Sequence, residues 1–322
     1  MHIIIPDDYQ NAVTHLACWA TLAGHTVTVF NDTVKEVDTL VERFYPADAL
    51  ILIRERTQIT EALLARLPNL KLISQTGKGI AHIDAAACTR HHVLICAGTG
   101  SPVAPAELTW ALIMAAMRHI PQEVAHLRAG GWQTTVGKVL RGRTLGIFGY
   151  GKIGALVAGY GRAFGMKVLV WGREGSLARG RADGYTPTPD AATLFAQSDV
   201  LSLHLRLTPE TRGLVSPNDL ALMKPDALLV NTSRAELMAP GALEAALQAG
   251  RPGFAAIDVY EEEPILGANH PLLKLDNVIG TPHLGYVEKD SYELYFGQAF
   301  EQVNAFAEGR PIHVVNPEIH RI

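Results

Sequence analysis

A glycine-rich turn near the middle of the chain is the feature that most restricts how this sequence can fold. Its residues, Gly149-Tyr-Gly-Lys-Ile-Gly154, fit the pattern G-x-G-x-x-G. The apolar run Thr144–Phe148 before the turn predicts a buried strand, and Ala155–Phe164 after it predicts a helix. A second apolar run, Met166–Trp171, predicts the next strand. This order of strand, turn, helix and strand is the setting in which the pattern binds a dinucleotide.

Each of the three glycines in the turn meets a geometric need. Gly149 allows the tight turn, Gly151 leaves room for a pyrophosphate, and Gly154 lets the helix pack close to the strand. The free N–H groups and the positive dipole end at the start of the helix favour phosphates. A glycine-rich turn without a ligand is the alternative, but the neighbouring strands favour nucleotide binding. The turn residues predicted to bind the cofactor are Gly149, Tyr150, Gly151, Lys152, Ile153 and Gly154.

Length and composition place the chain among globular proteins. Its 322 residues, 48% of them hydrophobic, are enough for two domains. The net charge of −4 and the lack of a long basic run argue against nucleic acid as a partner. Three scattered cysteines suit neither a disulfide framework nor a cysteine-based metal site, so we expect no metal. No signal peptide or membrane-spanning run is recognisable, so we expect a cytoplasmic protein that does not engage a membrane.

The first ninety-odd residues alternate between two kinds of apolar pattern. Runs that predict strands are His2–Ile5, His25–Phe30, Ala49–Ile53, Leu70–Gln75 and Val93–Ala97. Patterns that predict helices between them are Tyr9–Leu22, Val34–Phe44, Glu61–Arg66 and Ile83–His91. Alternation of this kind predicts a parallel sheet with helices on both faces.

Gly98–Pro102 breaks the alternation and is the best candidate for a linker. The helix predicted at Ala104–Arg118 is apolar nearly all round, so we expect it to be buried between domains or in a homodimer interface. Further strands are predicted at Val200–Leu203, Ala227–Asn231, Phe254–Asp258 and Asn277–Gly280, and a last helix at Glu293–Glu308.

We therefore predict an α/β fold with two doubly wound parallel-sheet domains. A flavodoxin-like substrate domain comprises residues 1–98 and 288–322, because the last helix is expected to return to the first domain. A Rossmann NAD(P)-binding domain, residues 99–287, is inserted into it.

Four stretches, in this order, carry a resemblance to a known family. They are Leu145–Gly154, Met223–Arg234, Ala255–Pro264 and Thr281–His283. With a glycine turn near mid-chain, the sequence resembles the D-isomer-specific 2-hydroxyacid dehydrogenase family over essentially its whole length. The resemblance implies an oxidoreductase that transfers a hydride between NAD(P)H and the 2-position of a small 2-oxo acid or D-2-hydroxy acid. It also implies that the protein is a homodimer.

The catalytic set implied by the resemblance is Arg234, Glu263 and His283. A guanidinium can bind the substrate carboxylate with fork geometry and polarise the neighbouring carbonyl. A histidine can donate the proton that the developing alkoxide needs, and a carboxylate on its other ring nitrogen favours the imidazolium. Taken singly, the three residues could also be a surface ion pair, part of a solvated acidic run and a hydrogen-bonded loop residue.

The resemblance implies further cofactor contacts. Asp258 matches an aspartate that binds the nicotinamide carboxamide, and His204 matches a residue of a loop that lines the cofactor. Thr232 and His283 complete the cofactor-binding residues that we expect in these stretches. Arg206 stands where the family usually has proline, so local contacts of this loop can differ.

The loop Gly77-Lys-Gly-Ile80 matches the family loop whose backbone N–H groups hold the substrate carboxylate. The residues expected to bind substrate are Arg54, Lys78, Gly79 and Ile80. Lys78 replaces a residue that is usually small and uncharged, and Ala81 stands where an acidic or amide residue is frequent. Lys78 is either a substrate contact or a solvated loop lysine. These departures leave the substrate open, but not the reaction.

The position that selects between the two nicotinamide cofactors departs from the NAD pattern. An acidic residue normally follows the second strand and binds the ribose 2′-OH. Here Gly172 stands in that place and Arg173 follows it, which favours a 2′-phosphate and hence NADP(H). Glu174 could instead reach the ribose, so NAD(H) stays possible.

Two other functions compete with this interpretation. Some members of the same superfamily are nucleotide-sensing binding modules and not enzymes, but this sequence keeps all three expected catalytic residues. Formate dehydrogenase pairs its catalytic histidine with glutamine, whereas this sequence has Glu263.

Overall fold

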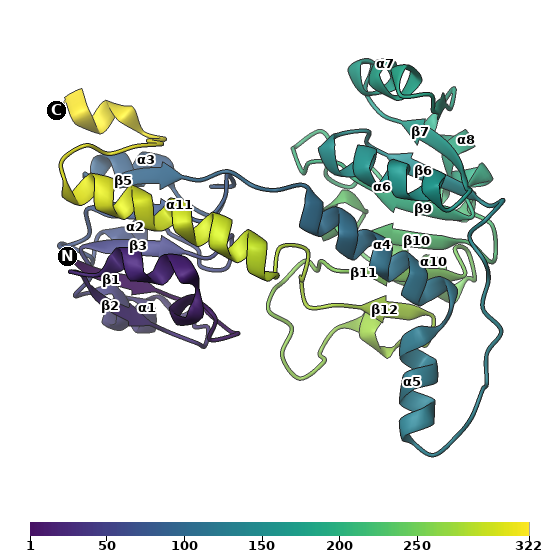
Figure 1. The fold of residues 1–322 in the computed structure, drawn as a ribbon, viewed down its shortest axis with the longest axis horizontal. Coiled ribbons are helices and arrows are strands. Elements are labelled where there is room, and N and C mark those ends of the chain that lie inside the picture. Colours follow the sequence, from purple (N-terminus) through teal and green to yellow (C-terminus); the bar gives the residue numbers. More distant parts are fainter. Residues whose placement is uncertain (322) are drawn as a thin grey trace. The chain divides into compact units, whose positions relative to one another are not determined.

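The computed structural model describes residues 1–321, with side chains described through Ile319. The chain divides into two compact units (Figure 1). Unit 1 consists of Met1–Ser101 and the segment from Glu288 onward, and unit 2 is Pro102–Val287. Among the described residues, no helix is both long and apolar enough to cross a membrane.

Unit 1 is built on a five-stranded sheet in which all neighbouring strands are parallel. The strand order is β2-β1-β3-β4-β5, so the direction of winding reverses between β1 and β3. Such a reversal leaves a crevice at the carboxyl ends of the two strands, where ligands of open α/β sheets bind. The strands are β1 (His2–Ile5), β2 (Thr26–Val29), β3 (Ala49–Leu52), β4 (Leu72–Gln75) and β5 (Leu94–Ala97).

Helices cover both faces of this sheet. On one face an apolar cluster joins the sheet to α1 (Val37–Phe44), α2 (Glu61–Leu64) and α3 (Ala85–Arg90). On the other, α11 (Lys289–Ala307) packs against β4 and β5 (Figure 1). The Ser74 hydroxyl on β4 donates a hydrogen bond to Gln302 Oε1 on α11, at 2.7 Å. Helix α11 is therefore part of the core of unit 1.

The helix predicted at Tyr9–Leu22 is not one continuous helix, and it begins later than predicted. The structure has two 3₁₀ helices there, η1 (Val13–His15) and η2 (Ala17–Leu22), separated by the extended residue Leu16. The Asp8 carboxylate accepts hydrogen bonds from the N–H groups of Ala12 and Val13 and so holds the start of η1 in a local turn. A last short 3₁₀ helix, η5 (Pro317–Arg321), ends the described chain.

Unit 2 is built on a seven-stranded, wholly parallel sheet of order β12-β11-β10-β9-β6-β7-β8. Because β6 and β9 are neighbours, the winding reverses between them. Both sheets are thus doubly wound and parallel, which confirms the predicted fold class. The strands are β6 (Thr144–Phe148), β7 (Lys167–Trp171), β8 (Thr186–Pro187), β9 (Val200–Leu203), β10 (Leu228–Asn231), β11 (Phe254–Ile257) and β12 (Val278–Gly280).

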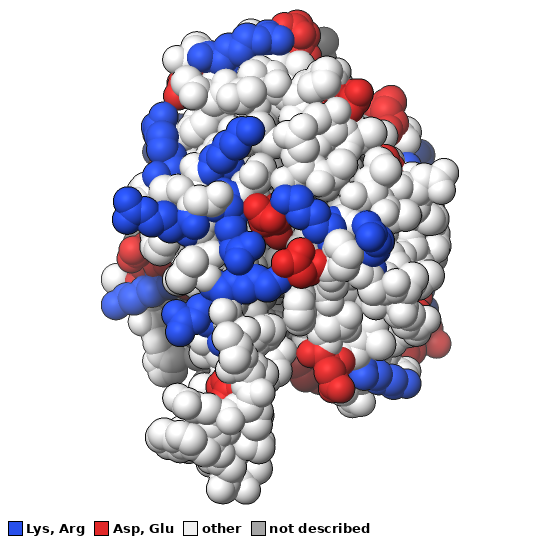
Figure 2. Space-filling model, turned by 90° about the vertical axis from the view of Figure 1, so that its right-hand side faces the viewer, with Lys and Arg blue, Asp and Glu red and all other residues white. Residues whose placement is uncertain are grey.

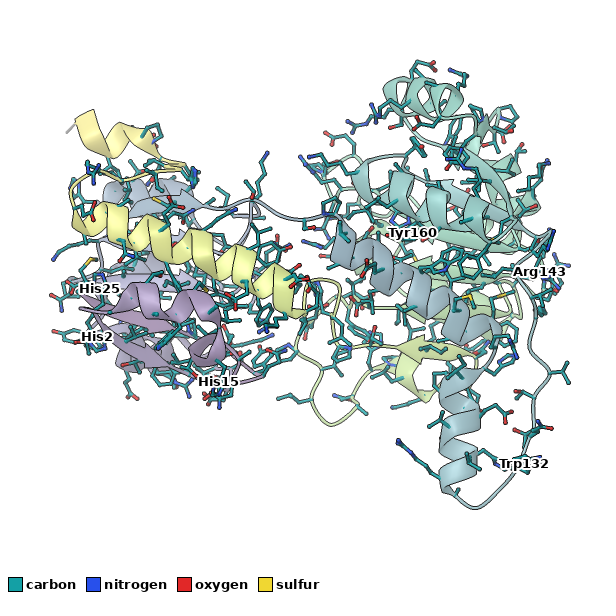
Figure 3. All side chains as sticks on the ribbon, in the orientation of Figure 1. His2, His15, His25, Trp132, Arg143 and Tyr160 are labelled. Carbon is teal, nitrogen blue, oxygen red and sulfur yellow. The ribbon has the colours of Figure 1, made fainter. Side chains whose placement is uncertain are left out.

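Two apolar clusters bury the faces of this sheet. One contains α4 (Val103–Met117) and α6 (Lys152–Ala163). Tyr160 of α6 is labelled in Figure 3, and the centre of its ring lies 6.0 Å from that of Trp110 on α4. The other contains α8 (Ala191–Gln197), α9 (Pro217–Ala221) and α10 (Ala242–Gln248). The remaining elements are α5 (Ile120–Arg128), α7 (Glu174–Ala182), η3 (Ala235–Leu237) and η4 (Pro271–Lys274).

Only one side of α4 is buried within the chain, although the helix is apolar nearly all round. Leu112 and Ile113 lie in the core, whereas Val103 is 45% exposed. The next helix, α5, has no buried residue and exposes Ile120, Val124 and Leu127. An apolar surface of this kind on α4 and α5 favours association with another protein surface.

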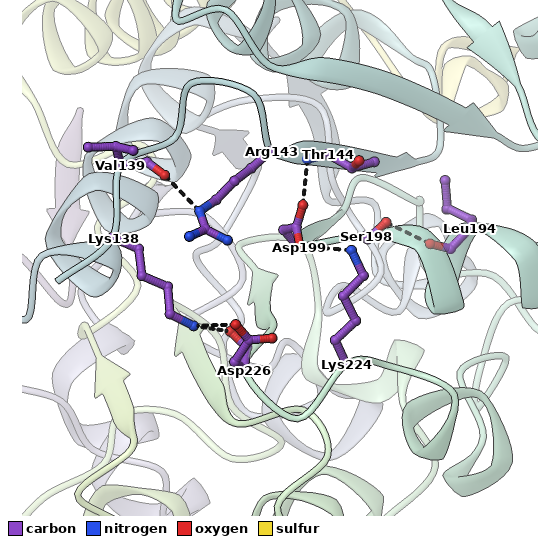
Figure 4. A network of polar contacts seen from close by, with 9 residues as sticks. All are labelled: Lys138, Val139, Arg143, Thr144, Leu194, Ser198, Asp199, Lys224 and Asp226. Carbon is purple, nitrogen blue, oxygen red and sulfur yellow. Dashed lines mark hydrogen bonds and ion pairs between the residues drawn. The ribbon is translucent and has the colours of Figure 1, made fainter.

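The amino edge of the seven-stranded sheet is held by ion pairs and backbone contacts (Figure 4). Asp199 accepts a hydrogen bond from the Thr144 N–H and pairs with Lys224 at 2.8 Å. Lys138 pairs with Asp226 at 2.7 Å. These two ion pairs are partly exposed, and pairs of this kind each stabilise a fold by about 1 kcal/mol or less. Figure 2 shows further Lys and Arg side chains on the face that is on the right of Figure 1, with carboxylates among them.

Candidate active site

The opposite, carboxyl edge of the same sheet carries the residues predicted to act in catalysis. Arg234 follows β10, Asp258 follows β11 and His283 follows β12. Because the strands are parallel neighbours, the loops after them emerge at one edge. Glu263 lies in the loop between β11 and β12.

His283 and Glu263 form a direct pair. Nδ1 of His283 lies 2.6 Å from Oε2 of Glu263, and both side chains are about one-third exposed. Glu263 Oε1 accepts a hydrogen bond from the backbone N–H of Tyr260. Burial pushes the pKa of the Glu263 carboxyl upward, but His283, the Tyr260 N–H and Arg234 outweigh burial and leave that pKa lowered. The carboxylate is therefore ionised near neutral pH and fixes which ring nitrogen of His283 faces away from it.

Arg234 is held by its own turn. The Asn231 side chain donates to the carbonyl of Arg234 at 2.8 Å and accepts from the N–H of Ser233 at 3.0 Å. The Arg234 guanidinium donates to the carbonyl of Ser233. Asn231 is completely buried and was not among the predicted site residues. The sequence feature that could have revealed Asn231 is its position at the carboxyl end of a core strand, because a buried amide there needs hydrogen-bond partners.

Asp258 organises the loop that contains His283. Its Oδ1 accepts hydrogen bonds from the Thr281 hydroxyl and the Leu284 N–H, both at 2.7 Å, and its Oδ2 accepts from the Gly285 N–H at 2.9 Å. Burial raises the pKa of Asp258, although these donors and the nearby His283 oppose the rise. The carboxylate thus holds the residues on both sides of His283, which itself has a left-handed φ of 52°.

The glycine turn has the geometry that a dinucleotide requires. Gly149 has a φ of +101°, and a Cβ there would lie 2.6 Å from the carbonyl oxygen of His204. Gly151 precedes the first residue of α6, supplies no side-chain cap, and has no atom within 4 Å of where a Cβ would be. This open space at a helix N-terminus fits the pyrophosphate of a dinucleotide. Lys152 is exposed at the first turn of α6 and Ile153 is half-buried.

The Tyr150 side chain points away from this open space. It is 2% exposed, and its hydroxyl donates to Asp183 at 2.6 Å. Only the backbone of Tyr150 is therefore left to meet a cofactor. Its carbonyl accepts a hydrogen bond from the Arg179 guanidinium, which also donates to Ser176. Arg179, on α7, thus lies directly beside the glycine turn.

The end of β7 places the residues predicted to select the cofactor. Gly172 is half-buried there and Arg173, the N-cap of α7, is exposed. Glu174 pairs with Arg181 at 2.9 Å. Its carboxylate is therefore directed along α7 to Arg181.

His204 and Thr232 are both anchored by other side chains. Nε2 of His204 lies 2.9 Å from the Ser202 hydroxyl, and Nδ1 is buried without a partner in the described structure. Burial lowers the pKa of His204 to about 4, so the ring is neutral near pH 7. The Thr232 hydroxyl lies 2.7 Å from that of Thr109 on α4. Thr232 therefore joins the end of β10 to the core.

The predicted substrate loop belongs to unit 1, where it follows β4. The Arg54 N–H donates to the Thr76 hydroxyl at 3.0 Å, so the loops after β3 and β4 are joined. Lys78 is exposed, and Gly79 and Ile80 are half-buried. The Arg54 guanidinium lies 5.6 Å from the centre of the Tyr295 ring on α11. The structure thus places Arg54, Lys78, Gly79 and Ile80 at the carboxyl edge of the sheet of unit 1.

Comparison with known proteins agrees with this architecture. Residues 110–285, more than half of the chain, match the model of the NAD-binding domain of D-isomer-specific 2-hydroxyacid dehydrogenases. The fold and this match define an oxidoreductase with a Rossmann unit that binds a nicotinamide cofactor. The chain belongs to the D-isomer-specific 2-hydroxyacid dehydrogenase family.

Relatives cover most of the chain. It is 37% identical to the glyoxylate reductase of Aeropyrum pernix over 299 residues, which is 88% of each chain. It is 36% identical over 275 residues to a D-3-phosphoglycerate dehydrogenase of Methanocaldococcus jannaschii, covering 84% of this chain but only 52% of that one. A crystal structure named phosphoglycerate oxidoreductase from Vibrio cholerae is 57% identical, with a TM-score of 0.94 over 96% of this chain and 99% of that one. The chain thus spans about half the length of that longer dehydrogenase.

Proposed function

We propose that this protein is an NAD(P)-dependent reductase of small 2-oxo acids, or the reverse D-2-hydroxyacid dehydrogenase. The observation that carries the proposal is the contact of 2.6 Å between His283 Nδ1 and Glu263 Oε2. The pair follows the carboxyl ends of the same parallel sheet as Arg234 and the glycine turn. Ligands of such sheets bind at that edge.

The three side chains divide the work. Arg234 binds the substrate carboxylate and polarises the adjacent carbonyl with its guanidinium. His283 gives a proton from Nε2 to the carbonyl oxygen during reduction and takes it back in the reverse direction. Glu263, ionised and bonded to Nδ1, stabilises the protonated ring and holds its orientation. The bound nicotinamide cofactor supplies or accepts the hydride.

The loop 77–80 and Arg54 of unit 1 are proposed to bind the substrate carboxylate through backbone N–H groups and the guanidinium. Gly77 has a φ of +89°, a conformation that glycine adopts without strain. Half-buried Gly79 and Ile80 continue this turn.

We propose that the preferred cofactor is NADP(H). Gly172 leaves no carboxylate to repel a 2′-phosphate, and Arg173 and Arg179 lie at the start of α7 and beside the glycine turn. The pairing of Glu174 with Arg181 supports this choice, because it occupies the carboxylate that could otherwise bind the ribose. NAD(H) remains the alternative cofactor.

The proposed assembly is a homodimer. Its support is the exposed stripe of Ile120, Val124 and Leu127 on α5, beside the half-exposed helix α4. These positions are one helical turn apart and so share one face. Two-fold symmetric pairing would cover this stripe in both copies at once. The proposed setting is the cytoplasm, on the compositional grounds given above.

Steady-state kinetics with a panel of 2-oxo acids, each with NADPH and with NADH, test this function. We expect turnover of at least one small 2-oxo acid and its loss in the variant Arg234→Ala. Tight nucleotide binding without turnover of any acid would instead support the nucleotide-sensing module.

A further inference from the structure

The loop after β4 in unit 1 has a charge that the proposed chemistry does not need. Gly77 and Gly79 flank Lys78, and each glycine is covered by a side chain from the loop after β3. The Arg54 guanidinium lies against Gly77, and Glu55 Oε1 lies 2.6 Å from where a Cβ of Gly79 would be. The two glycines admit these neighbours, so Lys78 is the one long side chain that rises from residues 77–79.

Lys78 is exposed and has no hydrogen-bond or ion-pair partner among the described side chains. The adjacent carboxylate, Glu55, lies against the neighbouring glycine and forms no ion pair with Lys78. Asp84, further along the loop, is occupied as the cap of α3, where it accepts from the Ala87 N–H at 2.9 Å. The ammonium group of Lys78 is therefore available to a ligand that approaches this edge.

The surrounding loops are positively charged. Residues 53–59 and 76–82 contain the cations Arg54, Arg56 and Lys78 and the single carboxylate Glu55. His82 adds no charge near pH 7, because burial lowers its pKa to about 4. Its ring is buried, and neither nitrogen has a partner in the described structure.

Arg56 is held in place close to the crevice between β1 and β3. Its guanidinium donates to the carbonyl of Asp7 at 2.5 Å and lies 4.3 Å from the centre of the Tyr9 ring. The crevice at such a reversal of winding is where α/β sheets bind ligands. The buried carboxylates Asp7 and Asp8 follow β1 at the same crevice and offset the charge of Arg56. The positive charge that this edge offers to a ligand is therefore chiefly that of Lys78.

A 2-oxo acid with a single carboxylate uses only part of this charge. In the proposed function, the guanidinium groups of Arg234 and Arg54 and the backbone N–H groups of residues 77–80 are enough to satisfy that carboxylate. We propose that Lys78 binds a second anionic group of the substrate, so that the preferred 2-oxo acids carry two anions. The inference rests on the proposed function and narrows its substrate class. The flexible stem and point charge of lysine suit either a distal carboxylate or a phosphate.

Two matched pairs of acids test this assignment. The first pair is 2-oxoglutarate and its 5-amide, which differ by one charge at nearly constant shape. The second pair is 3-phosphohydroxypyruvate and hydroxypyruvate. The measurement is kcat and KM for each acid with wild type, Lys78→Gln and Lys78→Arg. The control is Lys71→Gln, which removes a lysine just before the same strand, at its amino end, where it pairs with Asp48.

We expect wild type to prefer the dianionic member of at least one pair. A preference within the first pair would identify the second anion as a carboxylate, and one within the second pair would identify it as a phosphate. Lys78→Gln should reduce that preference about tenfold, mainly by raising KM, since the variant loses the charge-assisted contact with the second anion. Lys78→Arg and Lys71→Gln should keep it. The preference of wild type should also fall as ionic strength rises.

Equal use of both members of each pair by wild type, or an unchanged preference in Lys78→Gln, would overturn the inference while leaving the reductase function intact. If wild type turned over none of the four acids nor any other 2-oxo acid, the proposed function would fail as well.

Discussion

Oδ1 of Asp258 lies 2.7 Å from the amide nitrogen of Leu284, the residue that follows His283. The same oxygen accepts from Thr281, two residues before His283. A buried carboxylate at the end of β11 therefore fixes the backbone on both sides of the histidine. Resemblance to the family suggested only a contact between Asp258 and the cofactor. The structure shows that Asp258 also holds the backbone of the loop that contains His283.

Asp258→Asn should lower both activity and stability. The asparagine NH₂ group cannot accept from a backbone N–H, so one of the donors at Leu284 and Gly285 loses its acceptor. We expect the free energy of unfolding to fall by about 1 to 3 kcal/mol and kcat by roughly 10- to 100-fold as His283 shifts. Urea unfolding and steady-state kinetics measure the two effects. Thr281→Val, which removes one donor and leaves none orphaned, should have a smaller effect on both.

His283→Asn should lower kcat for reduction by about 100- to 10,000-fold, the contribution typical of general acid catalysis. Asparagine is the better replacement here because residue 283 has a φ of 52°, which asparagine tolerates. An unchanged melting temperature would show that the loss is chemical. Near wild-type reduction of every active 2-oxo acid would mean that another group donates the proton.

Glu263→Gln should move the pH optimum of reduction downward. The ionised carboxylate favours the protonated ring of His283, whereas glutamine carries no charge. Reduction requires the protonated ring, so the variant should need a more acidic solution to reach the same fraction of active enzyme. The profile of kcat/KM against pH checks this shift. A profile that coincides with that of wild type would remove Glu263 from the assigned role.

Arg173→Ala should lower kcat/KM for NADPH by about tenfold and change the value for NADH little, because the charge-assisted contact serves only the 2′-phosphate. Arg179→Ala should act in the same direction. Glu174→Gln is the matched control on the same helix: Glu174 pairs with Arg181, so the ratio of the two cofactors should stay constant. A wild-type preference for NADH that persists in Arg173→Ala would contradict the assignment.

Light scattering at micromolar concentration should give about twice the chain mass of 34.8 kDa. Val124→Glu and Leu127→Glu place a charge on the exposed stripe of α5 and should shift the protein toward a monomer. A wild-type monomer with full activity would remove the homodimer from the proposal.

Stability should decline between pH 6.5 and pH 5 in a way that depends on His204. Its folded pKa of about 4 lies below the unfolded value, so the unfolded chain takes up a proton first as the pH falls. The stabilisation is complete above about pH 6.5 and is lost progressively toward pH 4. By pH 5 the loss amounts to about 2 kcal/mol. Urea unfolding at both pH values should show a smaller decline in His204→Asn than in wild type.

The sequence predicted the strands of the fold closely. The bounds of β1, β6 and β9 agree with the predicted runs, because buried parallel strands are short and continuously apolar. The helices α5, α7, α8, α9 and α10 were not predicted. They are five to nine residues long, too short to show a clear apolar periodicity. The segment Tyr9–Leu22 was predicted as one helix, but the Asp8 carboxylate delays its start to Val13 and the extended residue Leu16 divides it into two 3₁₀ helices.

For the candidate site, the sequence indicated candidate residues but not the contacts that hold them in place. The pairing of Glu263 with His283 was expected from family resemblance, and the two atoms lie 2.6 Å apart. The contacts of Asp258 join residues 23 to 27 positions apart, a range over which no local pattern acts. Likewise, the ion pair between Glu174 and Arg181 depends on rotamers that local sequence does not fix.

The packing of α11 on β4 has a consequence for how the protein matures on the ribosome. Unit 2 is a continuous segment, Pro102–Val287, and is synthesised whole before α11 emerges. Until then the β4 face of unit 1 lacks the helix that covers it, and the Ser74 hydroxyl lacks its acceptors, Ala299 and Gln302. Synthesis of unit 1 starts before that of unit 2, yet unit 1 can complete its packing only afterwards, so its β4 face stays uncovered for as long as unit 2 takes to be made.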